Sequence, residues 1–419
     1  MKEFDRIIGY DSIKKELIEM ADMLSSPKQY TKMGATLPSG ILLIGNPGLG
    51  KSLMATCLIQ ASGLPSRVVR KTKSKDFTEE ITKAFEEAKK NAPSILLLDD
   101  MDKFANEDNN HPDADEYVAV QAGIDMVKGF GVFVIATVNN RHKLPDSLLR
   151  PGRFDRILSL PTPSGSDAEK IIRHYLNQKP LAPDVSIDDL CKMIPYHSCA
   201  ALESILNEAA IKSTFKKKSA IDMSDLIEAV LCVEYETPDS TFHVEDSRVA
   251  RVAVHEAGHA LMSELLVSGS VGLVSLRKTG RNDTGGFVHR CKDLPESQMQ
   301  VMIFLAGKVA EEIIYGYSAE GCSNDLSHAI RHVESLVLDH HYGLWDMTTH
   351  LRNSESSLSE IHTVTRNELE RYERKVRAML TPHRDLIQQI ADRLREKETL
   401  LASDIASVCK NLERSPLAV

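Results

Sequence analysis

One octapeptide constrains the fold of this 419-residue chain more than any other segment. Gly45–Ser52 (GNPGLGKS) matches the pattern GxxxxGK[ST] and directly follows the apolar run Ile41–Ile44. A strand before the pattern and a helix after it are the context in which it forms a phosphate-binding loop. Its glycines let backbone N–H groups approach phosphate oxygens, and the following helix N-terminus favours negative charge. The segment therefore predicts an α/β nucleotide-binding domain rather than an ordinary glycine-rich turn.

The surrounding sequence alternates short apolar runs with amphipathic stretches. Ile95–Leu98 and Val132–Ala136 are continuously apolar, as is typical of buried parallel strands with helices on both faces of the sheet. Pro161–Ser166 ends this alternation, and residues 167–233 have only helical patterns. The rest of the chain is mostly helical apart from a glycine-rich extended segment near 271–290. We expect an α/β domain with a parallel sheet (1–163), a small helical domain (164–236), a linker (237–246) and a mostly helical domain (247–419).

The nucleotide site predicted from these motifs would bind ATP and Mg²⁺. Lys51 would neutralise the β- and γ-phosphates, and the Ser52 hydroxyl would ligate Mg²⁺. Asp99 and Asp100 end the Ile95–Leu98 run, where Asp99 would hold the Mg²⁺ shell and Asp100 would orient the attacking water. The predicted nucleotide-binding residues are Ile8, Gly45, Asn46, Pro47, Gly48, Leu49, Gly50, Lys51, Ser52, Leu53 and Asp99.

A second motif, HEAGH at 255–259, has the spacing of a zinc-peptidase helix. On a helix, positions i and i+4 place both imidazoles, His255 and His259, on one face at zinc-ligand distance. Glu256 would deprotonate the attacking water and later protonate the leaving amine. A catalytic zinc needs a third protein ligand, and spacing alone leaves Glu311, Glu312, Asp325 and His328 open.

Bulk properties exclude several classes of protein. A formal charge of −9 argues against a general nucleic-acid binder. The seven cysteines form no CxxC pair, which favours reduced thiols in the cytosol over a disulfide framework. No apolar stretch reaches the ~18–20 residues needed to cross a bilayer. We therefore expect a soluble, cytoplasmic chain whose association with a membrane would require a segment outside this sequence.

The first half of the chain resembles the AAA+ ATPases, and specifically the FtsH family. Leu148–Arg156 (LLRPGRFDR) is nearly the second region of homology of that family. The resemblance implies that Arg150 and Arg153 are arginine fingers reaching the γ-phosphate in a neighbouring subunit. It also implies that Asn139 is the sensor that polarises the attacking water. Because fingers supplied by a neighbour require a ring, the resemblance implies a homohexamer.

The second half carries the same resemblance. Gly321–Leu326 (GCSNDL) is similar to the GASND motif of the family, whose aspartate is the third zinc ligand, and this selects Asp325. Ala310–Gly316 (AEEIIYG) matches a family helix, which implies that Glu311 and Glu312 orient a ligand histidine. His328 and His332 follow on one helical face, where a solvated or packed role is favoured over ligation. Thr284–Arg290 lies where the family has an edge strand beside the zinc. On sequence alone an ordinary structural hairpin is an equal alternative.

Four departures from the family affect the predicted motor, and none affects the predicted zinc site. The membrane-spanning N-terminal part of the family has no counterpart in these residues. The aromatic pore loop expected after Lys75-Asp76-Phe77 is missing about eight residues, and a helix is expected at Lys83–Lys90. Phe77 is the nearest candidate for the gripping aromatic, although a core position is the favoured interpretation.

The other two departures are substitutions. Asp100 replaces the glutamate of the family, and Lys128 reverses the charge of an intersubunit signalling element. In addition, Cys199 replaces a glycine near the adenine.

The sequence therefore predicts an ATP-dependent zinc metalloendopeptidase with ATPase activity that degrades unfolded or loosely folded proteins as a hexameric ring. One alternative is a peptidase gated by nucleotide binding, with weak or no translocation, because the pore aromatic is missing and Asp100 is short. Another is a nucleotide-dependent chaperone or scaffold in which proteolysis is incidental.

Overall fold

The computed structural model describes residues 2–72, 76–105, 114–150, 152–195, 197–237, 247–279, 282–338, 355–410 and 412. These residues form two compact units, the first comprising 1–179 with 196–207 and the second 180–195 with 208–419. Of the predicted features, Lys75, Pro151 and the linker beyond Thr237 lie outside the described residues.

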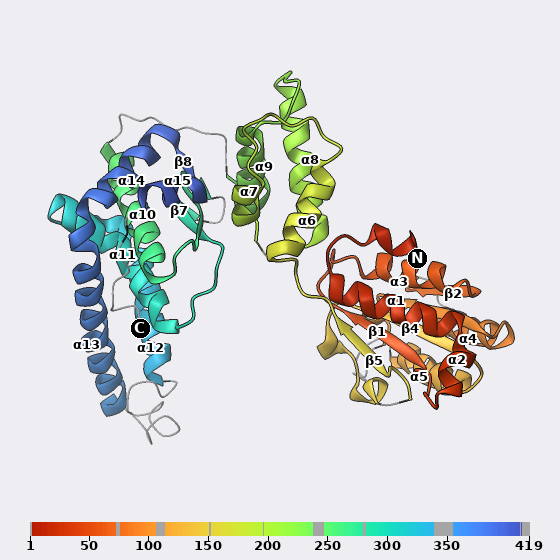
Figure 1. Ribbon diagram of the computed structural model, residues 1–419. Coiled ribbons are helices and arrows are strands. Elements are labelled where there is room, and N and C mark those ends of the chain that lie inside the picture. Colours follow the sequence, from red (N-terminus) through yellow and green to blue (C-terminus); the bar gives the residue numbers. More distant parts are fainter. Residues whose placement is uncertain are drawn as a thin grey trace. The chain divides into compact units, whose positions relative to one another are not determined.

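A five-stranded parallel sheet forms the centre of the first unit, in the order β2-β3-β4-β1-β5 (Figure 1). Its elements are α1 (Asp11–Ser25), α2 (Pro27–Lys32), β1 (Gly40–Ile44), α3 (Lys51–Ser62), β2 (Ser66–Arg70), α4 (Phe77–Lys90), β3 (Ser94–Asp99), α5 (Ala114–Val127), β4 (Val132–Val138), β5 (Arg156–Ser159) and α6 (Gly165–Leu176).

The three strands expected from apolar runs, β1, β3 and β4, are buried along their whole length and confirm the α/β prediction. Leu42 and Ile44 point to the face covered by α4 and α5, while α3 contacts β1, β3 and β4. The edge strands β2 and β5 have mostly exposed side chains and therefore lack the apolar run that marks a buried strand.

The helix expected at Lys83–Lys90 begins earlier, at Phe77. Phe77 is 1% exposed, and its ring meets Phe104 edge-on with centroids 5.3 Å apart. This burial confirms the core interpretation of Phe77. The side chain is therefore not presented to a translocating polypeptide.

The second unit contains the HEAGH helix. Its elements are α7 (Ile187–Met193), α9 (Met223–Tyr235), α10 (Ser247–Leu266), β6 (Val271–Thr279), β7 (Asn282–Arg290), α11 (Ser297–Tyr315), α12 (Ser323–Leu338), α13 (Glu355–Leu380), α14 (Arg384–Lys397), β8 (Thr399–Leu401) and α15 (Ala402–Val408). Helix α8 (Cys199–Phe215) contributes residues to both units, so the predicted small helical domain is shared between them. The predicted domain boundaries stay a prediction.

Helix α10 lies at the centre of this unit and contacts α11, α14 and the β6–β7 hairpin (Figure 1). The hairpin confirms the extended segment expected near 271–290. Strand β8 completes an antiparallel sheet in the order β7-β6-β8, which leaves β7 at an edge. With three residues, β8 is too short to be recognised from the sequence.

Helices α7 and α9 pack against the sheet of the second unit. Asp189 of α7 accepts hydrogen bonds from the N–H and hydroxyl of Ser403, at 2.9 and 2.8 Å. Tyr235, at the end of α9, stacks on Phe287 of β7 with ring centroids 4.3 Å apart. The edge strand is therefore supported by α9 on the side opposite the HEAGH helix.

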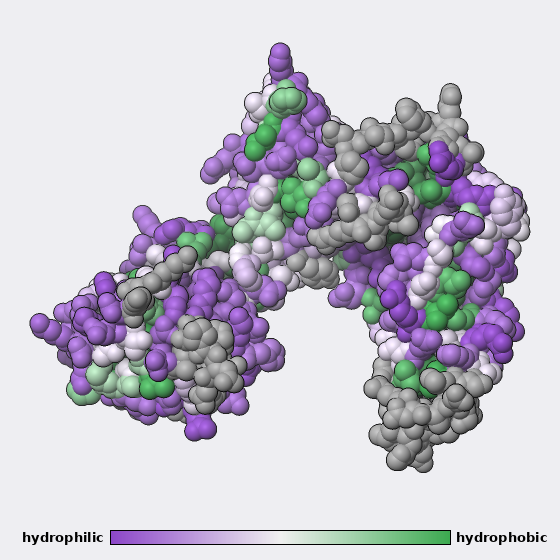
Figure 2. Space-filling view, turned by 180° about the vertical axis from the view of Figure 1, so that it is seen from behind, coloured by the Kyte–Doolittle hydropathy of each residue, from purple (hydrophilic) through white to green (hydrophobic). Residues whose placement is uncertain are grey.

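Among the helices that the structure describes, none combines the length and apolar character needed to cross a membrane. Figure 2 shows hydrophilic residues over most of the visible surface of the first unit, with hydrophobic residues in small groups.

Candidate active sites

The phosphate-binding loop connects β1 to α3 in the first unit. Gly48 and Gly50 have φ values of +79° and +87°, which are unfavourable for other residues. Lys51 begins α3, and its Nζ donates hydrogen bonds to the carbonyls of Gly45 and Asn46 at 2.6 and 2.8 Å. The ammonium group therefore lies at the centre of the loop, where phosphate oxygens would bind.

Asp99 ends β3 and is 1% exposed. It accepts hydrogen bonds from Ser52 Oγ at 2.8 Å and from Thr137 Oγ1 at 2.7 Å, so the predicted Mg²⁺ ligands Ser52 and Asp99 lie together. Arg70 binds the second carboxylate oxygen. Burial would raise the pKa of Asp99, but its bonds with Arg70, Thr137 and Ser52 hold that pKa below 3.8.

The contact between Arg70 and Asp99 was not predicted from the sequence. The parallel pairing of β2 with β3 aligns Arg70 with Asp99, and this register brings the two side chains together. The pairing register of β2 and β3 cannot be read from the composition of either segment. Knowing that register would have been enough to predict the contact between Arg70 and Asp99.

Asp100 and Asn139 follow the adjacent strands β3 and β4, and their side chains are in contact. Asn139 Nδ2 donates to Asp100 Oδ1 at 3.2 Å, and Lys103 Nζ donates to Asp100 Oδ2 at 2.6 Å. The backbone of Asp100 is left-handed, with φ of +53°. Two donors therefore fix the Asp100 carboxylate, which is shorter than the glutamate of the family, at the edge of the sheet where the strands end.

A cavity of about 300 Å³ in the first unit brings predicted nucleotide-binding residues together. The N–H of Ala200 at the start of α8 donates to the Gly48 carbonyl at 3.1 Å, which ties this helix to the phosphate loop. Residues lining the cavity include the predicted Ile8, Gly48, Leu49, Gly50 and Leu53, together with Cys199.

The two predicted arginine fingers differ in their surroundings. Arg150 is exposed, whereas the Arg153 guanidinium makes a bidentate contact with Asp125 at 3.0 and 2.7 Å and also donates to the Ser147 carbonyl. Arg153 is therefore held by its own chain. Arg150 is the arginine of this pair that is oriented toward solvent.

In the second unit, the HEAGH sequence forms one turn of α10. His255, Glu256 and His259 are 7%, 5% and 8% exposed, so this turn is buried. Gly258 permits close packing against α11, because a Cβ there would lie 2.5 Å from Ala310 Cβ. The glycine of the motif thus lets α11 approach and cover the two histidines.

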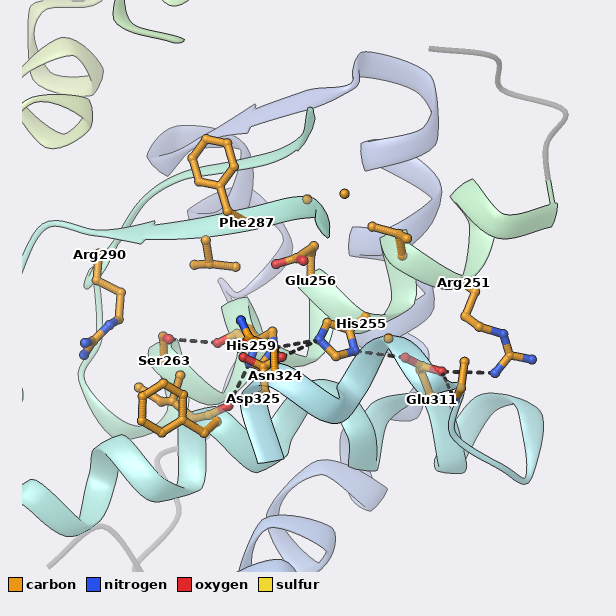
Figure 3. A pocket seen from close by; sticks show the side chains of 18 of the residues that line it. Arg251, His255, Glu256, His259, Ser263, Phe287, Arg290, Glu311, Asn324 and Asp325 are labelled. Atoms are coloured by element: carbon orange, nitrogen blue, oxygen red, sulfur yellow. Dashed lines mark hydrogen bonds and ion pairs between the residues drawn. The ribbon is translucent and has the colours of Figure 1, made fainter. Parts of the chain in front are cut away.

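Three ligand atoms converge in this turn (Figure 3). His255 Nε2 lies 3.0 Å from both Asp325 Oδ2 and His259 Nε2, and His259 Nε2 lies 3.4 Å from Asp325 Oδ2. The other ring nitrogens face acceptors, since His255 Nδ1 is 2.9 Å from Glu311 and His259 Nδ1 is 2.7 Å from the Ile303 carbonyl.

These contacts determine the tautomers. With both Nδ1 atoms protonated, two Nε2 lone pairs and a carboxylate oxygen point to one place, an arrangement that a bound cation would satisfy. Tetrahedral ligands about 2.0–2.1 Å from zinc lie about 3.3–3.4 Å apart, close to the spacing observed. The residues present therefore fit a zinc ion.

Gly307 of α11 lies directly behind the histidines. A Cβ at this position would lie 2.5 Å from His255 Nε2 and 2.6 Å from His259 Nε2. Only glycine leaves room for both rings, so Gly307 contributes to the site through the absence of a side chain. This role of Gly307 was not predicted from the sequence.

Glu311 and Glu312 were both expected to orient a histidine, and this is wrong for Glu312. Glu311 contacts His255 Nδ1, but Glu312 lies on the other side of α11 and pairs with Lys308 and Arg377. Successive residues of a helix are separated by about 100°, so two adjacent glutamates do not reach the same ring.

Cys322 and Arg251 are further neighbours that the sequence analysis missed. Arg251 Nη1 donates to Glu311 at 3.0 Å, and Cys322 Sγ lies 3.3 Å from Glu311 Oε1. Burial would raise the pKa of Glu311, but its bonds with His255, the Ala319 N–H and Arg251 lower the pKa to about 2. The carboxylate facing His255 is therefore held ionised.

Glu256 points from α10 toward β7, on the strand side of the histidines (Figure 3). It lies against Gly286, where a Cβ would be 2.7 Å from Glu256 Oε1. Burial raises the pKa of this carboxyl above its ordinary 4.5. A carboxyl group in this position, beside three converging ligand atoms, is suited to accepting a proton from water and returning it to a leaving group.

His328 and His332 do not join the ligand set, in agreement with the packed-face interpretation. Their rings lie against Phe304, with centroids 5.4 and 6.3 Å away. Within the part of the chain that the structure describes, the His255, His259 and Asp325 group is accompanied by one other potential metal-binding group, which shares His255.

Comparisons with known proteins agree with both sites. Residues 41–162 match the ATPase family associated with various cellular activities (AAA), and residues 243–408 match peptidase family M41. The ATP-dependent zinc metalloprotease FtsH 3 of Symbiobacterium thermophilum is 30% identical over 98% of this chain and 71% of the relative.

Two further relatives have the same relationship. FtsH of Streptococcus pneumoniae serotype 4 is 31% identical over 97% of this chain and 67% of the relative. FtsH of Ureaplasma parvum is 30% identical over 96% of this chain and 60% of the relative. The chain thus spans between 60% and 71% of the length of these three proteins. On this evidence the chain belongs to the FtsH family of ATP-dependent zinc metalloproteases.

Proposed function

We propose that this chain is a zinc metalloendopeptidase whose action on proteins depends on ATP. The observation that carries the proposal is the convergence of His255 Nε2, His259 Nε2 and Asp325 Oδ2, with the Glu256 carboxyl group on the adjacent side of α10. The three relatives are named as ATP-dependent zinc metalloproteases, and their similarity to this chain supports the same activity.

The proposed chemistry assigns a role to each group around the turn. His255, His259 and Asp325 would hold the zinc ion, which when bound supplies Lewis-acid chemistry toward a peptide carbonyl and increases the acidity of water. Glu256 takes a proton from the attacking water and returns it to the leaving amine. Glu311 keeps the proton on His255 Nδ1, so that the Nε2 lone pair stays directed at the metal position.

Strand β7 supplies the proposed substrate contact. Among the described strands, none pairs with the outer edge of β7, and Gly286 places the backbone of β7 against Glu256. An extended polypeptide could add to this edge through main-chain hydrogen bonds. Because those bonds do not depend on side chains, the substrate class is unfolded or loosely folded protein.

The first unit would bind ATP and Mg²⁺ with the groups already assembled there. Lys51 would contact the phosphates, Ser52 and Asp99 would hold Mg²⁺, and Asp100 with Asn139 would position water. Arg150 is exposed and would reach the nucleotide of a neighbouring copy. We propose a homohexamer on this basis.

The peptidase proposal is tested by Glu256→Gln and by chelation of the metal. Cleavage of a casein-like unfolded protein should be lost in the variant, because no carboxylate is left to accept the proton. It should also be lost on chelation and return when zinc is added back. Asp392→Asn, an exposed carboxylate change on α14, is the matched control. Equal cleavage by the parent and Glu256→Gln would refute the assignment.

A second candidate function is a peptidase gated by nucleotide binding without strong translocation. Two observations favour it: Phe77 is buried in the core, and Arg70 occupies one oxygen of Asp99. Cleavage of a stably folded protein should then depend on ATP hydrolysis no more than cleavage of a flexible peptide does. The test compares both substrates with ATP, with a non-hydrolysable analogue and without nucleotide. Folded-substrate degradation that needs hydrolysis would rule this candidate out.

A further inference from the structure

The cavity around the HEAGH turn is about 580 Å³ in volume, and among the described residues that line it Arg290 makes no ion pair. Two carboxylates of the cavity are already paired, Asp325 with the histidines and Glu311 with His255 and Arg251. The Glu256 carboxyl group lies against the backbone of β7. Arg290, which also lines the cavity, is not part of any of these pairs.

Arg290 ends β7 and is half-buried. Its Nη2 donates to the side-chain oxygen of Gln300 at 2.7 Å, while its Nη1 is buried without a hydrogen-bond partner among the described residues. No described carboxylate lies within ion-pair distance of it. The Asp293 carboxylate acts on the guanidinium only from beyond that distance. A guanidinium nitrogen that is buried without an acceptor is costly unless an anion completes the site.

The position of Arg290 on the strand relates it to the bond being cleaved. Side chains alternate between the two faces of a strand, so Arg290 leaves β7 on the same face as Gly286, which contacts Glu256. Figure 3 shows the Phe287 ring on the opposite side of the strand and the Arg290 guanidinium descending beside the pocket. Four residues of a strand span about 13 Å, which is the distance along β7 from Gly286 to Arg290. The long arginine side chain can reach back over roughly half of that distance.

We infer that Arg290 is a specificity-determining residue that binds a carboxylate of the substrate a few residues from the scissile bond. The inference rests on the proposed peptidase function. A carboxylate would accept the unpartnered Nη1–H and would pair with the buried charge. An aspartate or glutamate side chain and the C-terminal carboxylate of a peptide both supply this chemistry.

The test uses the zinc-loaded full chain and fluorogenic peptides on a neutral scaffold. Peptide pairs differ only by Glu or Gln at one position from four residues before to four after the cleaved bond, each with a free or an amidated C-terminus. We expect glutamate to increase kcat/KM by about tenfold over glutamine at one position, because a charged hydrogen bond replaces a neutral one. A preference that appears only with the free C-terminus would assign the site to the terminal carboxylate.

Variants of Arg290 establish whether this residue is responsible. In Arg290→Gln the Glu/Gln ratio should fall to near one, Arg290→Lys should restore part of it, and Arg290→Glu should favour lysine at the same position. Lys292→Gln, an exposed cation two residues further along that bonds the Ser268 carbonyl, is the matched control and should keep the parental ratio.

Binding provides a readout that does not depend on turnover. The affinity of a dye-labelled glutamate peptide, measured by fluorescence anisotropy on Glu256→Gln protein, should drop about tenfold when Arg290→Gln is added. Equal affinity for the glutamate and glutamine peptides, or a ratio unchanged by Arg290→Gln, would overturn the inference. If the parent cleaves no peptide at all, the proposed function fails, and the binding measurement still decides the carboxylate preference.

Discussion

His255 uses both ring nitrogens, and each contact constrains the other. Nε2 faces Asp325 and His259, while Nδ1 faces Glu311, which also accepts a hydrogen bond from the Ala319 N–H. The ring therefore has little freedom to rotate or change tautomer. Its precision as a ligand depends on a carboxylate that would itself never contact the metal.

Replacing Glu311 should weaken the site without removing a ligand. Glu311→Gln should lower zinc affinity or peptidase activity by about 10–100-fold, because a neutral amide accepts the Nδ1 proton less strongly. Zinc affinity can be measured by competition with a chromogenic chelator. The adjacent Glu312→Gln is the matched control, since Glu312 pairs with Lys308 and Arg377 instead. Equal effects of the two substitutions would contradict this role.

At the scale of elements, the geometry of α10 against β7 and α11 depends on glycines. Gly307 makes room for the histidine rings, and Gly286 makes room for Glu256 with φ at +85°. Each lies on a neighbouring element rather than on the HEAGH helix. The site is therefore formed by the approach of three elements, and the motif alone would be insufficient.

Adjacent glycines of β7 should respond differently to substitution. Gly286→Ala places a methyl group against Glu256 and forces an unfavourable φ, so kcat/KM for an unfolded substrate should fall by ~10²-fold. Gly285→Ala should be tolerated, since nothing lies within 4 Å of its Cβ position. Steady-state kinetics of the two variants provides the comparison. A larger loss in Gly285→Ala would show that Glu256 is positioned in another way.

The start of α9 depends on a buried carboxylate. The Asp225 side chain is 0% exposed and pairs with Lys216 and Lys218, both at 2.9 Å, within a capping box formed with Asp222. Burial would raise the pKa of Asp225, but these lysines outweigh it and hold the pKa below 3.8. A lowered pKa means that the stabilisation is present above pH 3.8 and is lost as the pH falls below that value.

Asp225→Asn should therefore destabilise α9 near neutral pH by about 1–3 kcal/mol. The difference from the parent should shrink as the pH falls below the ordinary pKa. Hydrogen exchange of the α9 amides measures this locally. Glu228→Gln removes a half-exposed partner of Lys216 and should change the stability of α9 by less than about 0.5 kcal/mol. A pH-independent difference would refute the ionic explanation.

What the sequence could predict follows from how local each signal is. Strands β1, β3 and β4 are buried on both faces and show as apolar runs, and HEAGH needs only one helical turn. The ligand convergence of Asp325 required the family resemblance, because 66 residues separate it from His259 in the chain. Arg70, Gly307 and Arg290 depend on strand register and helix contacts. The periodicity of the segments that contain these three residues does not predict their contacts.

At the scale of the whole molecule, the two candidate sites belong to separate compact units. The nucleotide loop, Asp99 and Arg150 lie in the first, and the HEAGH turn lies in the second. Helices α7 and α9 belong to the second unit and contact its sheet at β6 and β7. Helix α8 contributes to both, with Ala200 bound to the phosphate loop at its first turn.

The ring proposal predicts complementation between inactive variants. Lys51→Ala should lose nucleotide binding, and Arg150→Ala should lose hydrolysis while keeping nucleotide. In mixed rings, a Lys51→Ala copy would supply Arg150 to a neighbour that still binds ATP, so ATPase activity should exceed the sum of the separate variants. Phosphate release after mixing measures this. Lys32→Ala, an exposed lysine of α2, replaces Lys51→Ala in the control mixture. Strictly additive rates would contradict trans-acting arginines.

The unpaired edge of β7 has a consequence for the fragments that this protein would leave behind. Main-chain pairing requires a backbone N–H at alternate positions of the bound polypeptide, and proline has none. Fragments from a complete digest should therefore be poor in proline on either side of their cut ends, and proline-dense stretches should survive intact. The composition of the surviving peptides would then record the orientation and length of the paired segment.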